Sequence, residues 1–217
     1  MDIIKQIEMD KIYKTLPLER IPWDIETPPK ILVELIESGR IKPCKVIDLG
    51  CGSGNYAIYL ATKGFDVTGV DISTAAIRIA RKKAKEKKVK CNFFVLDVVE
   101  DLDKISKTFD FAYEWGLLHH IFPDKRKRYV KNVYKILNLG GKYLCMCFNE
   151  KDNYFSGSGK YRKTPLGTTV YLSSEDELKM LFSPYFNIID LKVVELHGKF
   201  GLHIANYVFM EKKNISL

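Results

Sequence analysis

The sequence shows no long apolar run, no secretory-signal pattern in its first residues and no internal repeat, and each absence argues against a class of protein. Its uninterrupted apolar stretches stay far below the roughly 20 residues that a membrane-spanning helix needs. The amino terminus, MDIIKQIEMDKIYKTLP, mixes charges with apolar residues, whereas a secretory signal has a basic start and an unbroken apolar core. We therefore expect a soluble, cytoplasmic protein without a membrane partner.

Cysteine is present but unpaired, which argues against a disulfide framework and a zinc site. The five cysteines are odd in number and scattered, with no C-x-x-C pair and no histidine at zinc-ligand spacing. We expect free thiols and no metal. Cys145 and Cys147 would face the same side of a strand, where core filling is the expected role.

The positive charge is concentrated in one segment. The chain has 35 Lys and Arg against 27 Asp and Glu, a net charge of +8, which raises the possibility of nucleic-acid binding. Much of the excess lies in residues 78–90, where lysines surround a narrow apolar stripe without the interleaved aromatics that stack on bases. A solvated outer helix face is the preferred interpretation, and nucleic acid remains an alternative partner.

Strands and helices alternate regularly through the first two thirds of the chain. Apolar and β-branched runs predict strands, and 3.6-residue periodicity with capping residues predicts helices between them. This alternation is typical of right-handed βαβ units, so we predict one doubly wound, Rossmann-like α/β domain over residues 1–217. The predicted strands are 45–50, 65–71, 90–97, 108–115 and 141–149, and the predicted helices are 56–64, 75–87 and 124–137.

After residue 150 the pattern changes. Residues 152–169 are polar and rich in glycine, and long loops in compact domains are often functional, so they are a candidate lid. For recognition of the acceptor, Tyr154, Phe155 and Tyr161 of this loop could provide an aromatic wall, and Arg162 could provide a positive charge. A short helix over 173–182 precedes strands 186–196 and 202–212, whose five-residue connection predicts an antiparallel hairpin at the sheet edge.

The segment VIDLGCGSGN indicates a ligand site at the end of the first strand. A strand running through glycines into a helix presents backbone N–H groups and a positive helix dipole. Gly50, Gly52 and Gly54 are followed by Asn55, so the spacing is G-x-G-x-G and lacks the third glycine of the dinucleotide fingerprint. A nicotinamide-dependent oxidoreductase is therefore a disfavoured alternative.

Three acidic residues, one within the first predicted strand and one at the end of each of the next two, define the ligand further. Asp48 would repel a diphosphate and favour a cation. Asp71 is placed to accept hydrogen bonds from both ribose hydroxyls, and Asp97 from an adenine amino group. A cationic adenosine ligand without phosphates fits all three residues, and S-adenosylmethionine is such a ligand.

At these residues the chain resembles the class I S-adenosylmethionine-dependent methyltransferases, through VIDLGCGSGN, GVDIS and FVLDVVE. The resemblance implies a seven-stranded, mostly parallel sheet with an antiparallel last strand, and S-adenosylhomocysteine as product. It divides the chain into an N-terminal helical cap segment (1–44), a cofactor-binding core (45–150), and a lid loop with a C-terminal hairpin (151–217). The implied cofactor residues are Trp23, Asp48, Gly50, Cys51, Gly52, Gly54, Asn55, Asp71, Ile72, Asp97, Val98 and Glu114.

The acceptor is indicated less specifically. At the end of the fourth strand, Glu114 and His120 are the candidate catalytic residues, because a histidine there could accept a proton from the acceptor. Trp23, in the segment PW, either covers the cofactor or packs on the sheet edge. This segment and HHIFPDKRKRY resemble the thiopurine, thiol, halide and tellurite-resistance methyltransferases, with Arg126 or Arg128 and Tyr129 at matching positions.

The resulting prediction is an enzyme, a monomer or homodimer, that methylates a small molecule. The acceptor atom is expected to be a soft nucleophile: sulfur, halide or nitrogen. The N/D-P-P-Y/F/W tetrapeptide of nucleic-acid amino methyltransferases is absent. An RNA methyltransferase and a cofactor-binding protein without catalysis remain the alternatives.

Overall fold

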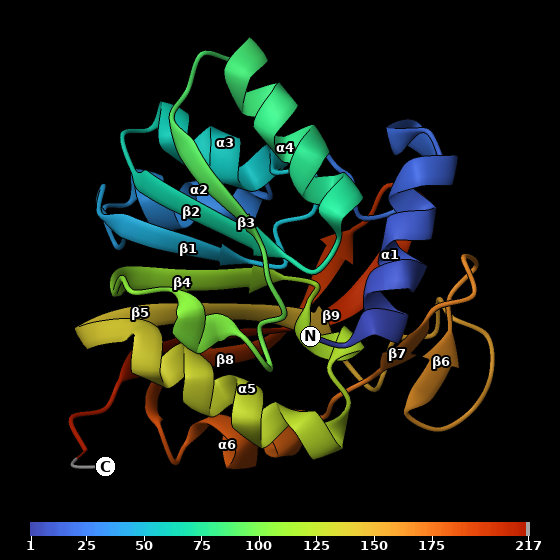
Figure 1. Cartoon of the computed structure of the whole chain (residues 1–217). Helices are drawn as coiled ribbons and strands as arrows, with labels where there is room; N and C mark the ends of the chain where they lie inside the picture. The colour runs from blue at the N-terminus through green and yellow to red at the C-terminus, as the bar shows by residue number, and fades with distance from the viewer. Residues whose placement is uncertain (216–217) are drawn as a thin grey trace.

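A computed structural model describes residues 1–215 as one seven-stranded sheet with helices on both faces (Figure 1). The strands of this sheet are β1 (Lys45–Leu49), β2 (Asp66–Asp71), β3 (Cys91–Val95), β4 (Phe109–Trp115), β5 (Leu137–Phe148), β8 (Phe186–His197) and β9 (Leu202–Lys212). The helices are α1 (Ile3–Thr15), α2 (Lys30–Glu37), α3 (Asn55–Thr62), α4 (Thr74–Glu86), α5 (Pro123–Ile136) and α6 (Glu175–Phe182).

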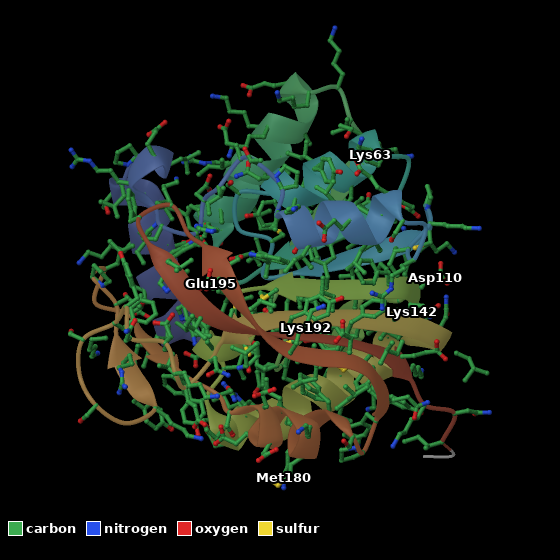
Figure 2. All side chains as sticks on the ribbon, turned by 180° about the vertical axis from the view of Figure 1, so that it is seen from behind. Lys63, Asp110, Lys142, Met180, Lys192 and Glu195 are labelled. Atoms are coloured by element: carbon green, nitrogen blue, oxygen red, sulfur yellow. The ribbon has the colours of Figure 1, made fainter. Side chains whose placement is uncertain are left out.

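The strand order is β3-β2-β1-β4-β5-β9-β8. The first five strands in the chain pair in parallel, while β9 is antiparallel to both β5 and β8. The order reverses between β1 and β4, and in doubly wound sheets ligands bind at the carboxyl ends of strands at such a point. The predicted α/β class, the antiparallel last strand and the hairpin at the sheet edge are confirmed. Lys192 and Glu195 belong to the edge strand β8 of that hairpin (Figure 2).

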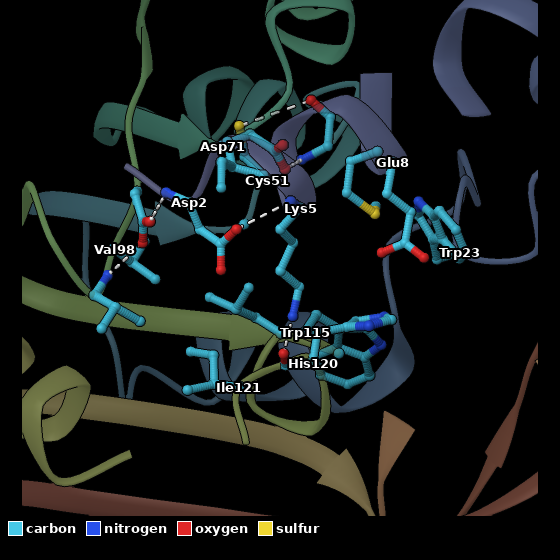
Figure 3. Close-up of a pocket in the computed structure, with 18 of the residues that line it drawn as sticks. Asp2, Lys5, Glu8, Trp23, Cys51, Asp71, Val98, Trp115, His120 and Ile121 are labelled. Carbon is cyan, nitrogen blue, oxygen red and sulfur yellow. Dashed lines mark hydrogen bonds between the residues drawn. The ribbon is translucent and has the colours of Figure 1, made fainter. Parts of the chain in front are cut away.

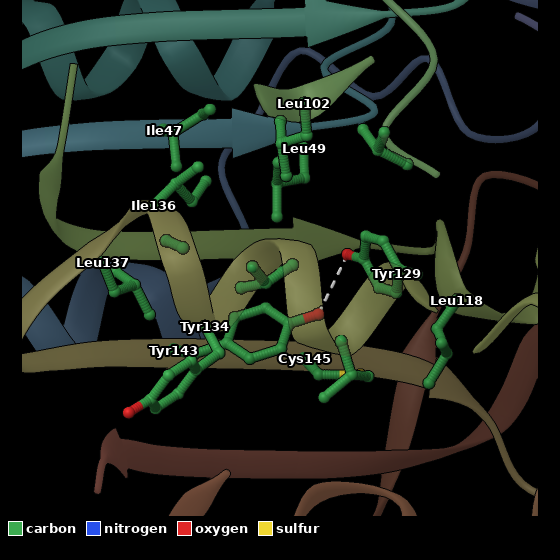
Figure 4. Packing of buried hydrophobic residues seen from close by; sticks show 14 of the residues in the cluster. Ile47, Leu49, Leu102, Leu118, Tyr129, Tyr134, Ile136, Leu137, Tyr143 and Cys145 are labelled. Carbon is green, nitrogen blue, oxygen red and sulfur yellow. Dashed lines mark hydrogen bonds between the residues drawn. The ribbon is translucent and has the colours of Figure 1, made fainter. Parts of the chain in front are cut away.

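Two apolar clusters cover the two faces of the sheet. Ile47 and Leu49 of β1 point toward the cluster beneath α5 and α6, whereas Val46 packs with α2, α3 and α4. This alternation is the two-residue period of a strand buried on both sides. Cys145 lies in the first cluster with Tyr143 and Tyr129, whose hydroxyls are hydrogen-bonded at 3.0 Å (Figure 4). Cys147 is in the same cluster, so both cysteines fill the core as predicted.

Some elements differ from the predicted pattern. The candidate lid contains a small two-stranded sheet, β6 (Tyr161–Lys163) with β7 (Thr169–Tyr171). Strand β5 begins at Leu137, directly after α5, because this residue pairs with Phe109 across a register shift. Among the residues that the structure describes, no helix has the length and apolar character needed to cross a membrane.

Candidate active site

A cavity of about 430 Å³ lies at the carboxyl ends of β1, β2, β3 and β4. The turn after β1 forms one wall, and its Gly50 and Cys51 amides donate to the Val70 carbonyl at 2.8 and 2.9 Å. Gly50 and Gly52 have φ values of +73° and +53°, a left-handed conformation that glycine adopts without steric cost. The predicted residues Gly50, Cys51, Gly52 and Asn55 all line this cavity.

The two acids at the ends of β2 and β3 lie in the same cavity. The Asp71 oxygens accept the Gly52 amide at 2.9 Å and the Ser73 amide at 2.8 Å. One Asp97 oxygen accepts the Val99 amide at 2.9 Å. A carboxylate has about four acceptor positions, so both acids keep capacity for a ligand's hydroxyl or amino groups. Ile72 and Val98 line the cavity beside them.

Asp48 forms the polar floor of the cavity. Its Oδ2 accepts the Tyr113 hydroxyl at 2.6 Å, and the carboxyl is almost completely buried. Burial raises the pKa of Asp48 to about 7, against the lowering effect of the Tyr113 hydrogen bond. A cation beside Asp48 would favour its ionised form, which is the behaviour expected of a site for a positively charged ligand.

Helix α1 closes the cavity from outside the sheet (Figure 3). The Asp2 amide donates to Asp97 Oδ2 at 2.8 Å, and the Lys5 ammonium donates to the His120 carbonyl. Asp10 fastens the helix by accepting the Ser73 hydroxyl at 2.6 Å and the Ala75 amide at 2.9 Å. The sequence predicts a helical cap segment, but it does not predict which residues of that segment line the cavity. They are Asp2, Ile4, Lys5, Glu8, Met9 and Tyr13.

Asp24 supplies an acceptor that the protein itself leaves unused. Its Oδ1 accepts the Asn55 amide nitrogen at 3.0 Å, while its buried Oδ2 has no partner among the described residues. Asp24 lines the cavity, so an ammonium group bound there would find this oxygen free. Together with Asp48, Asp71 and Asp97, it forms a set of acceptors that fits an adenosyl ligand with an amino acid tail.

Two predicted cofactor residues lie outside the cavity lining. Glu114 is fully buried, and its carboxylate accepts the Leu117 amide at 2.6 Å, the Leu118 amide at 3.3 Å and the Cys145 thiol at 2.7 Å. Burial raises the pKa of Glu114 to about 7. Gly54 is the N-cap of α3, where a Cβ atom would lie 2.8 Å from the Ala80 Cβ. Both residues hold the backbone of loops beside the cavity.

A second cavity, of about 610 Å³, adjoins the first. Its walls are mainly apolar and aromatic, and they come from the segment before α2, the end of β5, the candidate lid and the β8–β9 hairpin. The two cavities share six lining residues: Trp23, Ile25, Tyr56, Trp115, Gly116 and His120. The shared residues mark the junction where a ligand in one cavity meets a ligand in the other.

The junction is built from aromatic rings and a neutral imidazole. The Trp23 indole donates to the Tyr13 hydroxyl at 2.9 Å and meets the His120 ring edge-on, with 6.3 Å between ring centroids. Tyr56 and Trp115 also meet edge-on at 6.3 Å. Burial lowers the pKa of His120 to about 3, so its imidazole is uncharged at neutral pH. Trp23 lines both cavities and also packs against the cluster that contains Ile12 and Ile21.

The lid contributes aromatic residues to the second cavity but no cation from Arg162. Tyr154 and Phe155 line the cavity, whereas the Arg162 guanidinium bonds to the carbonyl of Gly159 and reaches neither cavity. Arg126, in the segment after β4, is buried and donates to the carbonyls of Ile121 and Leu118 and to the Ser173 hydroxyl. These hydrogen bonds hold the loop of residues 118–121, which contains His120, in place.

Comparisons with known proteins agree with this geometry. Residues 46–141 match a family described as "Methyltransferase domain". The chain is 25% identical over 179 residues to the 2-heptyl-1-hydroxyquinolin-4(1H)-one methyltransferase of Mycobacteroides abscessus, covering 82% of this chain and 74% of that protein. It is 35% identical over 109 residues to ubiquinone biosynthesis O-methyltransferases of Coxiella burnetii, but covers only 45% of their length.

Solved structures share the whole architecture. A SAM-dependent methyltransferase from Methanosarcina mazei superposes with a TM-score of 0.71 at 25% identity, over 87% of this chain and 99% of that one. The 1,6-didemethyltoxoflavin-N1-methyltransferase of Burkholderia thailandensis, with bound S-adenosylhomocysteine, gives 0.65 at 21% identity, over 98% of this chain and 85% of that one. These similarities show that the chain shares the fold of S-adenosylmethionine-dependent methyltransferases.

Proposed function

We propose that the chain, which is a class I S-adenosylmethionine-dependent methyltransferase, transfers the methyl group to a small aromatic acceptor held in the second cavity. The proposal rests on one observation: the cofactor cavity and a larger apolar cavity meet at a junction of aromatic rings. The relatives whose names specify heterocyclic substrates support this acceptor class.

The first cavity would hold the cofactor through residues already described. Asp71 would bind the ribose, Asp97 and Val98 the adenine, and Asp24 the ammonium group of the amino acid tail. Bound there, S-adenosylmethionine supplies an electrophilic methyl group on a positively charged sulfur. Trp23, Tyr56 and Trp115 present ring faces or edges at the junction, and ring faces attract cations.

At the junction, His120 would orient the acceptor without opposing the cofactor. An uncharged imidazole does not repel the sulfonium and can accept a hydrogen bond from the acceptor. With a pKa of about 3 it is a weak base, so the acceptor has to be a good nucleophile already. This requirement agrees with the soft nucleophile expected from the sequence, with nitrogen or sulfur on an aromatic ring favoured over a halide ion that an apolar cavity of about 610 Å³ would not bind well.

Transfer of a labelled methyl group to a panel of candidate acceptors tests the proposal. The panel contains 2-heptyl-1-hydroxyquinolin-4(1H)-one, a thiopurine, an aryl thiol, iodide and total RNA. We expect label in the aromatic products and none in methyl iodide or RNA. Label in RNA or methyl iodide alone would contradict the proposed acceptor class, and would support the RNA or the halide alternative instead.

A further inference from the structure

His203 is a polar group that lies among aromatic rings in the wall of the second cavity. It lies near the start of β9, and its ring packs against those of Phe148, Tyr154 and Phe155 at centroid distances of 4.7, 4.3 and 5.2 Å. Its side chain is only 11% exposed. A buried polar group needs a hydrogen-bond partner, because an unpaired one costs stability.

Asp152 satisfies one of the two ring nitrogens of His203. Its Oδ2 lies 3.2 Å from His203 Nδ1 and also accepts the Ile204 amide at 2.7 Å, while its Oδ1 accepts the Tyr154 amide at 3.0 Å. A carboxylate oxygen accepts hydrogen bonds, so in the tautomer with one ring N–H the proton lies on Nδ1. The lone pair of Nε2 is then an acceptor.

Nε2 is left open to the cavity. No hydrogen bond from a residue in the described part of the chain reaches it. Gly198 lies next to it, and a Cβ atom at that position would stand 3.3 Å from Nε2 and 3.0 Å from Cδ2. Glycine at position 198 therefore keeps the approach to this nitrogen clear on the cavity side, where both residues contribute to the lining.

His203 is set back from the junction by a series of packed rings. The ring centroids of His120, at the junction, and His119 are 4.7 Å apart. The His119 ring stacks on the Phe148 ring at a centroid distance of 4.1 Å, and the centroids of Phe148 and His203 are 4.7 Å apart. An aromatic acceptor with its reacting atom beside His120 would extend along this wall, so its far end would approach His203.

We propose that His203 Nε2 accepts a hydrogen bond from an O–H or N–H group at the end of the acceptor remote from the methylated atom. Asp152 acts through His203, as a positioning residue that holds the required tautomer. The proposal rests on the proposed function, since it assumes an aromatic acceptor in the second cavity. It narrows that class to acceptors with a distal hydrogen-bond donor, because a purely apolar acceptor would bury Nε2 unpaired.

Binding of two probes of the same shape isolates the hydrogen bond. We would titrate the protein saturated with S-adenosylhomocysteine with 2-naphthol and with 2-methylnaphthalene, and follow the fluorescence of each. Wild-type protein should bind 2-naphthol about tenfold more tightly, the value expected for one net hydrogen bond. His203→Phe should reduce this ratio to about one. Asp152→Ala should reduce it as well, because Nδ1 then loses its acceptor and the ring proton can move to Nε2.

His197→Phe is the matched control, because His197 lines the same cavity from the same hairpin but is exposed. This variant should keep the preference for 2-naphthol, and the affinity of each variant for S-adenosylhomocysteine checks its fold. A preference that survives both His203→Phe and Asp152→Ala would overturn the inference and leave the proposed function intact. Wild-type protein that binds neither probe would overturn the aromatic acceptor class, and the inference with it.

Discussion

Asp71 shows how a single carboxylate is aimed at a ligand. Its two oxygens are held by the amides of Gly52 and Ser73, so the remaining lone pairs have a fixed direction in the cavity. We predict that Asp71→Ala weakens binding of S-adenosylhomocysteine by about 1 to 3 kcal/mol, because the ribose hydroxyls lose their acceptor. Calorimetric titration measures the loss. An unchanged dissociation constant would show that Asp71 does not bind the ribose.

Asp48 predicts how cofactor binding depends on pH. In the free protein its pKa is raised to about 7 by burial, so the carboxyl is protonated below that pH and ionised above it. The ionised form attracts the sulfonium, so affinity for S-adenosylmethionine should increase as the pH rises from about 6 to about 8. S-adenosylhomocysteine lacks the sulfonium charge and should respond less.

The variant Asp48→Asn provides the control for this pH dependence. It keeps the shape of the side chain and an oxygen for the Tyr113 hydroxyl, but it cannot ionise. We expect titrations of this variant with the two ligands to show the same small response to pH. An Asp48→Asn protein that keeps the full pH response of S-adenosylmethionine would assign the effect to another group.

The ends of strands were the most predictable parts of the site, and side-chain direction within a strand was the least. Asp48 lies near the end of β1, Asp71 ends β2 and Asp97 follows β3, and topology alone brings the ends of these parallel strands to one edge. Glu114 was expected in the site and instead points toward Cys145, whereas its neighbours Tyr113 and Trp115 face the opposite side. The two-residue period of β4 contains that information, since only one of two adjacent residues can face the ligand.

Helix α1 illustrates a second limit. Its sequence has isoleucines on several sides, and Ile3, Ile4 and Ile7 remain exposed, so no apolar stripe indicates which face meets the sheet. Its position depends on specific hydrogen bonds: the Asp2 amide donates to Asp97, and Asp10 accepts from the Ser73 hydroxyl and the Ala75 amide. Such long-range polar contacts have no signature in the sequence of the helix alone.

The contact of Asp10 with the start of α4 leads to a prediction about α1 as an element. Asp10→Ala removes the acceptor for the Ser73 hydroxyl and the Ala75 amide, so α1 should open more often and hold the cofactor less well. We expect faster hydrogen exchange of the amides in residues 3–15 and a weaker affinity for S-adenosylhomocysteine. Lys14→Ala is the control, because Lys14 contacts only the other Asp10 oxygen, at 3.1 Å. Equal exchange in the two variants would contradict this role of Asp10.

At the scale of the whole molecule, one sheet edge supports two adjoining cavities. The cavity of about 430 Å³ is enclosed by strand ends and α1, and the apolar one of about 610 Å³ by the lid and the hairpin. The two cavities are built mainly from different parts of the chain. The part up to β4 supplies the carboxylates of the first cavity, and the later segments supply most of the apolar wall of the second. Acceptor specificity is therefore expected to depend on the later segments.

The central claim is that the carboxylate-lined cavity binds an adenosyl cofactor for methyl transfer. The most direct measurement is calorimetric titration of the purified protein with S-adenosylmethionine, S-adenosylhomocysteine and NADH, repeated with total RNA present. We predict that both adenosyl ligands bind at one site, that NADH does not bind, and that RNA leaves these affinities unchanged. Binding of NADH with no response to either adenosyl ligand would contradict the assignment of the glycine turn and of the three strand-end acids.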